Sequence, residues 1–232
     1  MGHFAILGAG AWGTALARVL AERGEATRLW SWQAEHVAAM QSSRENRAFL
    51  PGFTLPDLVE PSFDLEHTLR GASVVLLVVP TAAFRSTLEQ ARAFLANDAT
   101  LLIATKGIEP GSLMLLSEVV AAVLGEPARD RTVVLSGPSF AKEVALGLPT
   151  SIVAAAHSAE LATSVQLRLS SDHFRVYAGD DPIGVQVGGA LKNVIAIAAG
   201  AVDGLGFGYN TRAALITRGL AEVARLALAK GG

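Results

Sequence analysis

The sequence predicts an α/β protein with a doubly wound, mainly parallel sheet, followed by an all-helical region. Over residues 1–180, short apolar runs of strand length alternate with longer segments of helical period. From residue 181 onward the strand-like runs disappear and two long helical segments follow. We therefore expect a first domain over residues 1–180 and a helical second domain over residues 181–232.

The expected elements follow this alternation in order. Each apolar run ends at Gly, Pro or polar residues, as a strand buried between helices does. The expected strands are Phe4–Leu7, Arg28–Trp30, Val74–Val79, Leu101–Ala104, Thr132–Leu135, Ser151–Ala155 and Phe174–Tyr177. The expected helices are Ala11–Arg23, Ala34–Ser43, Thr81–Ala96, Ser112–Leu124, Ala159–Ser170, Ile183–Val202 and Asn210–Lys230, with a Gly-rich turn at 203–208.

Composition and charge exclude several classes of protein. The chain contains no Cys, which excludes a disulfide scaffold, a Cys-ligated zinc site and a thiol nucleophile. The formal net charge is −2, so no global positive field attracts a nucleic acid. The longest apolar runs, Val74–Pro80 and Val194–Val202, are shorter than the ~20 residues that span a bilayer. The start, Met1–Phe4, lacks the basic region of a secretory signal. We expect a cytoplasmic protein with no membrane span and no metal.

A glycine-rich turn, Gly8–Gly13, directly follows the first expected strand and opens the first expected helix. Its G-x-G-x-x-G spacing is typical of Rossmann-like dinucleotide-binding domains. Gly8 allows the tight turn, Gly10 lets a pyrophosphate approach the backbone, and Gly13 lets the helix pack closely on the strand. The helix N-terminus attracts the phosphate charge. The alternative is a tight turn that needs glycines for steric reasons alone.

The end of the second expected strand bears on the choice between NAD and NADP. An acidic residue there would bind the ribose hydroxyls and favour NAD. The segment reads Trp30-Ser31-Trp32-Gln33 and contains no carboxylate, which favours NADP(H), although no Arg supplies a positive charge either. Trp32 is placed to stack on adenine, or it is simply a partly buried surface aromatic.

Lys192 is the most informative single residue. Its helix places Gly188, Gly189 and Ala196 on the same face as the lysine. An ammonium among such small residues is desolvated, which lowers its pKa and suits proton exchange with a reacting oxygen. Asn193 adds a second polar group to the same apolar stretch. The alternative is a lysine that reaches solvent from a tight helix crossing.

A second lysine, Lys106, directly follows the expected strand Leu101–Ala104. Ligands of open parallel sheets bind outside the carboxyl ends of the strands, so residues that follow strands converge on one crevice. Gly13, Pro80, Lys106 and the segment Ser136–Ser139 are expected to do so. Two lysines and two serines around this crevice suit a small phosphorylated substrate.

Several motifs together resemble those of bacterial NAD(P)-dependent glycerol-3-phosphate dehydrogenases. They occur in the order of that family along the whole chain. The matching segments are Gly8–Ala17, Asn46–Gly52, Val79–Pro80, Thr105–Gly107, Ser136–Glu143, Ala190–Val194 and Gly204–Leu215.

This resemblance implies interconversion of dihydroxyacetone phosphate and sn-glycerol 3-phosphate, which supplies glycerophospholipid synthesis. Lys192 matches the catalytic lysine of the family, and Lys106 matches a residue that touches both cofactor and substrate and polarises the carbonyl or holds charge. The resemblance gives Gly137, Ser139 and the pair Lys192–Asn193 as substrate-binding residues. It gives Ala11, Trp12, Phe49, Lys106 and Ala141 as cofactor-binding residues. Gly8, Gly10 and Gly13 of the glycine-rich turn and Trp32 are further cofactor-binding candidates from the residues themselves.

The sequence also departs from the family pattern. Trp32 replaces the His or Arg that is common at its position. Family members continue with a longer helical domain that carries an Asp beside the lysine and a Ser-Arg-Asn run. We therefore expect an incomplete second domain and a chain that binds cofactor but turns over poorly.

Three other interpretations remain open at this stage. A β-hydroxyacid or 6-phosphogluconate-type dehydrogenase shares the nucleotide domain, but it places an Asn one helical turn after the lysine, where this chain has Ala196. A non-catalytic NADP(H)-binding protein needs no convergence of Lys106, Lys192 and Ser139. A structural fragment would use its exposed helices as a homodimer interface.

Overall fold

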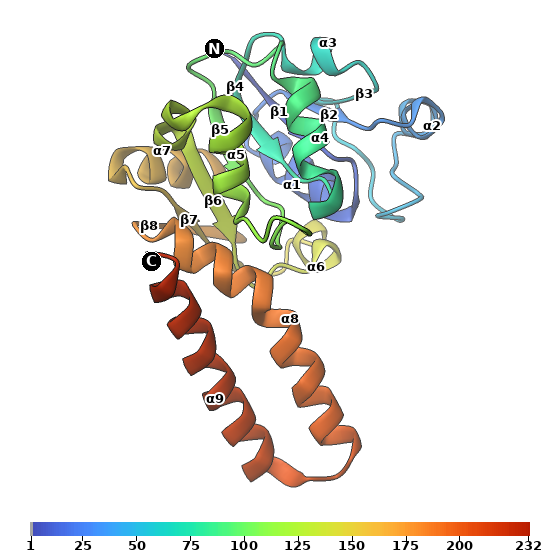
Figure 1. Cartoon of the computed structure of the whole chain (residues 1–232). Helices are drawn as coiled ribbons and strands as arrows, with labels where there is room; N and C mark the ends of the chain where they lie inside the picture. The colour runs from blue at the N-terminus through green and yellow to red at the C-terminus, as the bar shows by residue number, and fades with distance from the viewer. Residues whose placement is uncertain (1) are drawn as a thin grey trace.

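The computed structural model describes residues 2–232, so Met1, at the start of the expected first domain, lies outside the described residues. The chain forms an α/β unit from which a hairpin of two long helices extends (Figure 1). The α/β unit ends at residue 179 and the hairpin begins at residue 182, close to the expected boundary.

The strands and helices follow the expected alternation. The strands are β1 His3–Leu7, β2 Thr27–Trp30, β3 Val59–Ser62, β4 Ala72–Leu77, β5 Thr100–Ile103, β6 Thr132–Ser136, β7 Thr150–Ala155 and β8 Phe174–Gly179. The helices are α1 Ala11–Glu22, α2 Ala34–Ser43, α3 Leu65–Leu69, α4 Thr81–Ala91, α5 Leu116–Leu124, η1 Glu126–Arg131 (a 3₁₀ helix), α6 Ala141–Ala145, α7 Ala159–Leu169, α8 Pro182–Gly204 and α9 Gly208–Ala229.

The strands form one sheet in the order β3-β2-β1-β4-β5-β6-β7-β8. From β3 to β6 every neighbouring pair is parallel, which gives the strand order of a doubly wound dinucleotide-binding fold. β7 runs antiparallel to β6, and β8 is parallel to β7. The expected doubly wound, mainly parallel sheet is confirmed.

The hydrophobic core has two layers, one on each face of the sheet. Successive side chains of a strand point to opposite faces. In β4, Leu76 belongs to one buried cluster and Val75 to the other, and in β5 Leu102 and Leu101 divide in the same way. Helices cover both faces, so these strands need apolar residues at every position, as their continuous apolar runs indicated.

Some elements differ from the sequence expectation. β3, α3 and α6 were not predicted, because they are short and the segment Val59–Ser62 contains Glu60 and Pro61. Pro61 is tolerated because β3 lies at the edge of the sheet. α5 begins at Leu116 rather than Ser112, since Leu113 has a left-handed φ of 57°. α4 ends at Ala91 rather than Ala96.

The two long helices of the hairpin pack mainly on each other, and α8 also contacts β6 and β7. In α8, only Pro182, Gln186, Val187 and Val202 are buried, and in α9, which the structure describes completely, no residue is. By length and composition alone, α8 is long and apolar enough to cross a membrane. No apolar run of this length is visible in the sequence, because Lys192 and Asn193 interrupt the apolar residues of this helix. Core helices of soluble proteins have the same composition, so this observation does not by itself indicate a membrane protein.

Candidate active site

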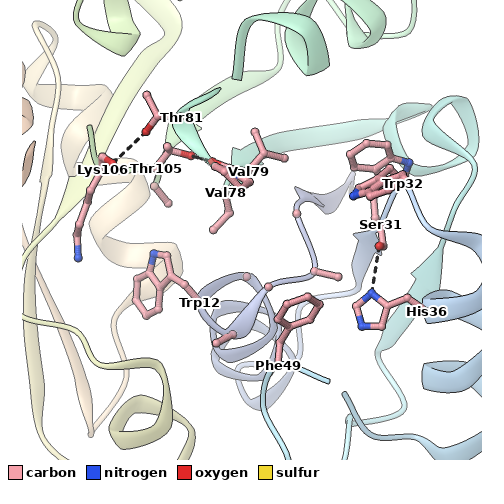
Figure 2. A pocket seen from close by; sticks show the side chains of 18 of the residues that line it. Trp12, Ser31, Trp32, His36, Phe49, Val78, Val79, Thr81, Thr105 and Lys106 are labelled. Carbon is pink, nitrogen blue, oxygen red and sulfur yellow. Dashed lines mark hydrogen bonds between the residues drawn. The ribbon is translucent and has the colours of Figure 1, made fainter. Parts of the chain in front are cut away.

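A cleft of about 490 Å³ lies at the carboxyl ends of the parallel strands. The loops after β1, β2, β4 and β5 supply most of its walls, as the convergence argument predicted. Figure 2 shows Trp12 and Lys106 on one side of the cleft and Trp32 and His36 on the other. The cleft is lined by Gly8, Ala9, Gly10, Ala11, Trp12, Gly13, Trp30, Ser31, Trp32, Gln33, His36, Phe49, Val78, Val79, Pro80, Thr81, Ala104, Thr105, Lys106 and Ser139.

The glycine-rich turn brings the N-terminus of α1 to the floor of this cleft. A Cβ on Gly13 would lie 1.9 Å from the Gly8 carbonyl oxygen, so only glycine lets α1 pack this closely on the turn. A Cβ on Gly10, in contrast, would meet no atom within 4 Å. Gly10 is the N-cap residue and has no side chain to satisfy the first N–H groups of the helix. The open space and the uncapped helix end therefore fit the pyrophosphate of a dinucleotide.

Two aromatic side chains flank the other side of the cleft. Trp32 is 75% exposed and Phe49 is 50% exposed, and both line the cleft. With Glu35 they also line an adjoining hollow of about 700 Å³. Exposed rings beside a cleft fit the planar base of a dinucleotide. Glu35 is an acidic residue near this position that the sequence argument did not consider, because it lies beyond the end of the strand, in the first turn of α2.

A hydrogen-bond chain connects this side of the cleft to the glycine-rich turn. His36 connects Ser31 to Asn46. Its Nδ1 lies 3.1 Å from the Ser31 hydroxyl oxygen (Figure 2), and its Nε2 lies 2.9 Å from Oδ1 of Asn46. The buried Asn46 amide donates to the Ala9 carbonyl at 2.9 Å and to the Thr14 hydroxyl at 2.7 Å. His36 and the role of Asn46 were not predicted, because residue spacing alone does not show that the loop of Asn46 folds back onto the glycine-rich turn.

Lys106 lies at the opposite side of the cleft. Its ammonium donates to the Gly137 carbonyl at 3.1 Å and to the Ser139 hydroxyl at 3.2 Å, which joins the loop after β5 to the loop after β6. The ammonium also lies 5.8 Å from the centre of the Trp12 ring. Burial, together with the positive charge of Lys192, lowers the pKa of Lys106 to about 8.

Helix α8 approaches this lysine side of the cleft at Gly189. A Cβ on Gly189 would lie 2.6 Å from the Ser136 hydroxyl and 3.7 Å from Cγ of Lys106. Lys192 follows Gly189 by three residues and therefore lies on the same face of the helix. Contrary to the sequence expectation of a desolvated ammonium, Lys192 is exposed, as is Asn193. The small residues beside Lys192 leave its long side chain free to reach water. The partly buried lysine of the site is instead Lys106.

The structure brings together most, but not all, of the predicted site residues. Those that line the cleft are Gly8, Gly10, Ala11, Trp12, Gly13, Trp32, Phe49, Lys106 and Ser139. Gly137 contacts Lys106 through its carbonyl. Ala141 begins α6 and packs against the core beside the site. Lys192 and Asn193 lie on α8 outside the walls of the cleft. Among residues 2–232 there is no group of three or more His, Cys, Asp or Glu side chains that could bind a metal.

Comparison with known proteins assigns this chain to a family. The sequence model described as NAD-dependent glycerol-3-phosphate dehydrogenase N-terminus matches residues 3–162, and the corresponding C-terminus model matches residues 181–232. The chain belongs to this family. Membership decides against the β-hydroxyacid and 6-phosphogluconate dehydrogenase alternative.

Individual relatives agree with the family assignment. A glycerol-3-phosphate dehydrogenase [NAD(P)+] of Trichlorobacter lovleyi is 52% identical over 226 residues, which are 97% of this chain and 68% of the relative. The enzyme of the same name from Geobacillus kaustophilus is 50% identical over 232 residues, which are 100% of this chain and 67% of the relative. The crystal structure of a glycerol-3-phosphate dehydrogenase from Coxiella burnetii superposes with a TM-score of 0.91 at 43% identity. The superposition covers 100% of this chain and 70% of the Coxiella burnetii chain.

Proposed function

We propose that this protein interconverts sn-glycerol 3-phosphate and dihydroxyacetone phosphate with NAD(P)(H). Its family membership supports the reaction. The observation that carries the proposal for this chain is the position of Lys106. A partly buried cation at one end of a dinucleotide cleft, held against the loop Gly137–Ser139, suits a small phosphorylated carbonyl substrate.

The cofactor would occupy the cleft with its pyrophosphate at Gly10 and Ala11, at the open N-terminus of α1. Trp32 and Phe49 would contact its adenine end, and Trp12 and Lys106 would lie toward its other end. The reduced dinucleotide, when bound, supplies the hydride that the substrate carbonyl carbon receives. Ala141 is a further cofactor contact in this proposal.

Two lysines would act on the substrate in different ways. Lys106 would polarise the carbonyl oxygen and attract the phosphate, with Gly137 and Ser139 beside it. Lys192 would donate a proton to the carbonyl oxygen during reduction and accept it during oxidation. Asn193, next to Lys192, would contribute a further substrate contact.

We propose a preference for NADP(H) over NAD(H). The cleft residues after β2 are Ser31, Trp32 and Gln33, and no carboxylate is among the described residues that line this cleft. Glu35, in the adjoining hollow, is the residue that opposes this preference. The ratio of kcat/KM for NADPH and NADH measures the preference. A ratio below one that reverses in Glu35→Gln would contradict the proposal and assign NAD selectivity to Glu35.

The reaction itself is tested by following NADPH oxidation by absorbance with dihydroxyacetone phosphate, in the wild-type chain and in Lys192→Ala. Turnover that is lost in the variant supports both the substrate and the proton-donor role. Unchanged turnover in the variant contradicts that role. NADPH binding without turnover of any phosphorylated ketone favours instead a non-catalytic NADP(H)-binding protein.

The setting of the protein completes the proposal. The reaction would take place in the cytoplasm and supply glycerol 3-phosphate to glycerophospholipid synthesis.

We place the domain boundary near residue 180, between the segments that match the two family models. We also propose a homodimer, because large apolar side chains such as Ile197 and Leu220 are exposed on the hairpin. Sedimentation at several concentrations tests the dimer, and a constant monomer mass would exclude it.

A further inference from the structure

Gln186 is a buried polar residue near the start of α8 that does not line the cleft. The residue is only 6% exposed, although most of its helix is in contact with water. Its side-chain amide makes three hydrogen bonds: the oxygen accepts from the Ser117 N–H at 2.9 Å, and the nitrogen donates to the Ser117 hydroxyl at 2.8 Å and to the Pro182 carbonyl at 3.0 Å. Two of them join α8 to α5, across 69 residues of sequence.

The partner of Gln186 is the first turn of α5, where the Glu118 carboxylate accepts the Leu115 N–H at 2.6 Å but not the Ser117 N–H. The N-cap residue of α5 is Leu115, whose side chain cannot accept a hydrogen bond from the first turn. The Ser117 N–H belongs to the first turn and has no partner within its own helix. Gln186 therefore caps α5 from another helix, and without it the partly buried Ser117 N–H would have no acceptor from the protein.

This contact lies one helical turn before α8 meets the lysine side of the cleft. Gly189, three residues after Gln186, is the point where α8 approaches Ser136 and Lys106. Lys192 follows after three more residues, about 9 Å along the helix axis from Gln186. α5 follows the Lys106 loop in the chain, so the Gln186–Ser117 contact joins the helix of one lysine to the segment that carries the other.

We propose that Gln186 is a positioning residue for the reaction: by capping α5, it holds α8 at the distance and rotation that place Lys192 beside Lys106. The proposal rests on the proposed function for the role of Lys192. α8 has few other buried side chains, and Gln186 is the polar one among those that the structure describes. Loss of its amide would leave α8 attached mainly through Pro182, Val187 and its contact at Gly189.

Two variants separate the hydrogen bonds from the shape of the side chain. Gln186→Met keeps a similar length but can neither cap Ser117 nor donate to it. Gln186→Glu keeps an oxygen acceptor for the Ser117 N–H, and a negative charge at a helix N-terminus is favourable. Its second oxygen can accept from the Ser117 hydroxyl, and only the donation to the Pro182 carbonyl within α8 is lost. We expect kcat for dihydroxyacetone phosphate reduction to fall about 10-fold or more in Gln186→Met, because small misplacements of a reacting group are costly. In Gln186→Glu we expect recovery to within about threefold of the wild type, because the cap is restored.

A second measurement reports the position of α8 without relying on turnover. The sequence contains no Cys, so Cys introduced at the exposed positions Gln90 on α4 and Ala201 on α8 can be spin-labelled selectively. The distance distribution between the labels is expected to be narrow in the wild-type and Gln186→Glu backgrounds and broader or shifted in Gln186→Met. The Kd of NADPH is expected to be the same in all three, since Gln186 does not line the cleft.

These measurements distinguish a positioning role of Gln186 from a general structural role. Gln186→Met with wild-type kcat and an unchanged distance distribution would overturn the proposal. Parallel losses of kcat, NADPH affinity and melting temperature in both variants would overturn it too, because they indicate a general structural role. If the wild-type chain shows no turnover, the proposed function fails in this chain, and the label distances alone decide whether Gln186 positions α8.

Discussion

Lys106 combines two properties at the scale of a single residue: it is partly buried, and it lies near a second positive charge. Both disfavour the ammonium form, which lowers the pKa of Lys106 to about 8 from an ordinary value of 10.5. The free protein therefore loses this charge as the pH rises through about 8. An anionic substrate that binds to Lys106 would favour the charged form and oppose this loss.

The first prediction concerns the pH dependence of the reaction. We expect kcat/KM for dihydroxyacetone phosphate to fall above pH of about 8, because kcat/KM reports ionisation in the free enzyme. In Lys106→Arg the guanidinium stays charged, so this alkaline limb is expected to disappear even though the rate is lower. Initial rates at saturating NADPH over a series of buffers measure it. An alkaline limb that is unchanged in Lys106→Arg would assign the titration to another group.

A second prediction concerns Asn46, whose buried amide connects His36 to the glycine-rich turn. Asn46→Ala leaves the Ala9 carbonyl and the Thr14 hydroxyl without this donor. We expect the free energy of unfolding to fall by about 1–3 kcal/mol, measured by urea denaturation, and the KM for NADPH to rise. Arg47→Ala, at the exposed neighbour, is the control and should cost about 0–1 kcal/mol. Equal losses in the two variants would remove Asn46 from this role.

At the scale of the element, the N-terminus of α1 separates a steric requirement from a binding requirement. A Cβ would collide with a backbone oxygen at Gly13 but would meet open space at Gly10. We expect Gly13→Ala to lower the melting temperature and Gly10→Ala to leave it unchanged. We expect Gly10→Ala to raise the Kd of NADPH, because the added methyl group occupies the space of the pyrophosphate. Thermal denaturation and fluorescence titration measure the two effects, and a stable Gly13→Ala variant that binds NADPH normally would refute the steric argument.

Elements with a strong local pattern could be predicted from the sequence. The apolar runs at β1, β4 and β5 and the glycine spacing before α1 depend on few neighbours, so the fold class and the position of the glycine-rich turn between β1 and α1 followed from the residues alone. β3 could not be predicted, because its alternation includes Glu60 and Pro61 and its partner β2 is distant in sequence. The same reason hid Asn46 and Gln186, whose partners come from other elements. It also explains why Lys192, expected to be desolvated, is exposed.

At the scale of the whole molecule, the α/β unit and the hairpin differ in how much they bury. The sheet lies between two apolar layers, whereas no residue of α9, described throughout, is buried. Amide groups of segments with few buried contacts open with a smaller free energy than those of the core. At protein concentrations where the chain is monomeric, we expect residues 208–229 to exchange hydrogen much faster than β4 in mass spectrometry. NADPH should protect residues 8–13 and leave the hairpin unchanged, and equal exchange in hairpin and sheet would contradict this prediction.

The cleft and the helix of Lys192 are built from different parts of the chain, and this has a kinetic consequence. None of the described residues that line the cleft comes from α8, whereas Lys192 belongs to α8, which approaches Ser136 and Lys106 at Gly189. The dinucleotide can therefore bind to a surface that is already complete, and the ketone binds to one that the dinucleotide helps to form. We expect an ordered sequence, with cofactor first to enter and last to leave. Product inhibition then has a defined pattern: NADP⁺ competes with NADPH, whereas glycerol 3-phosphate does not compete with it.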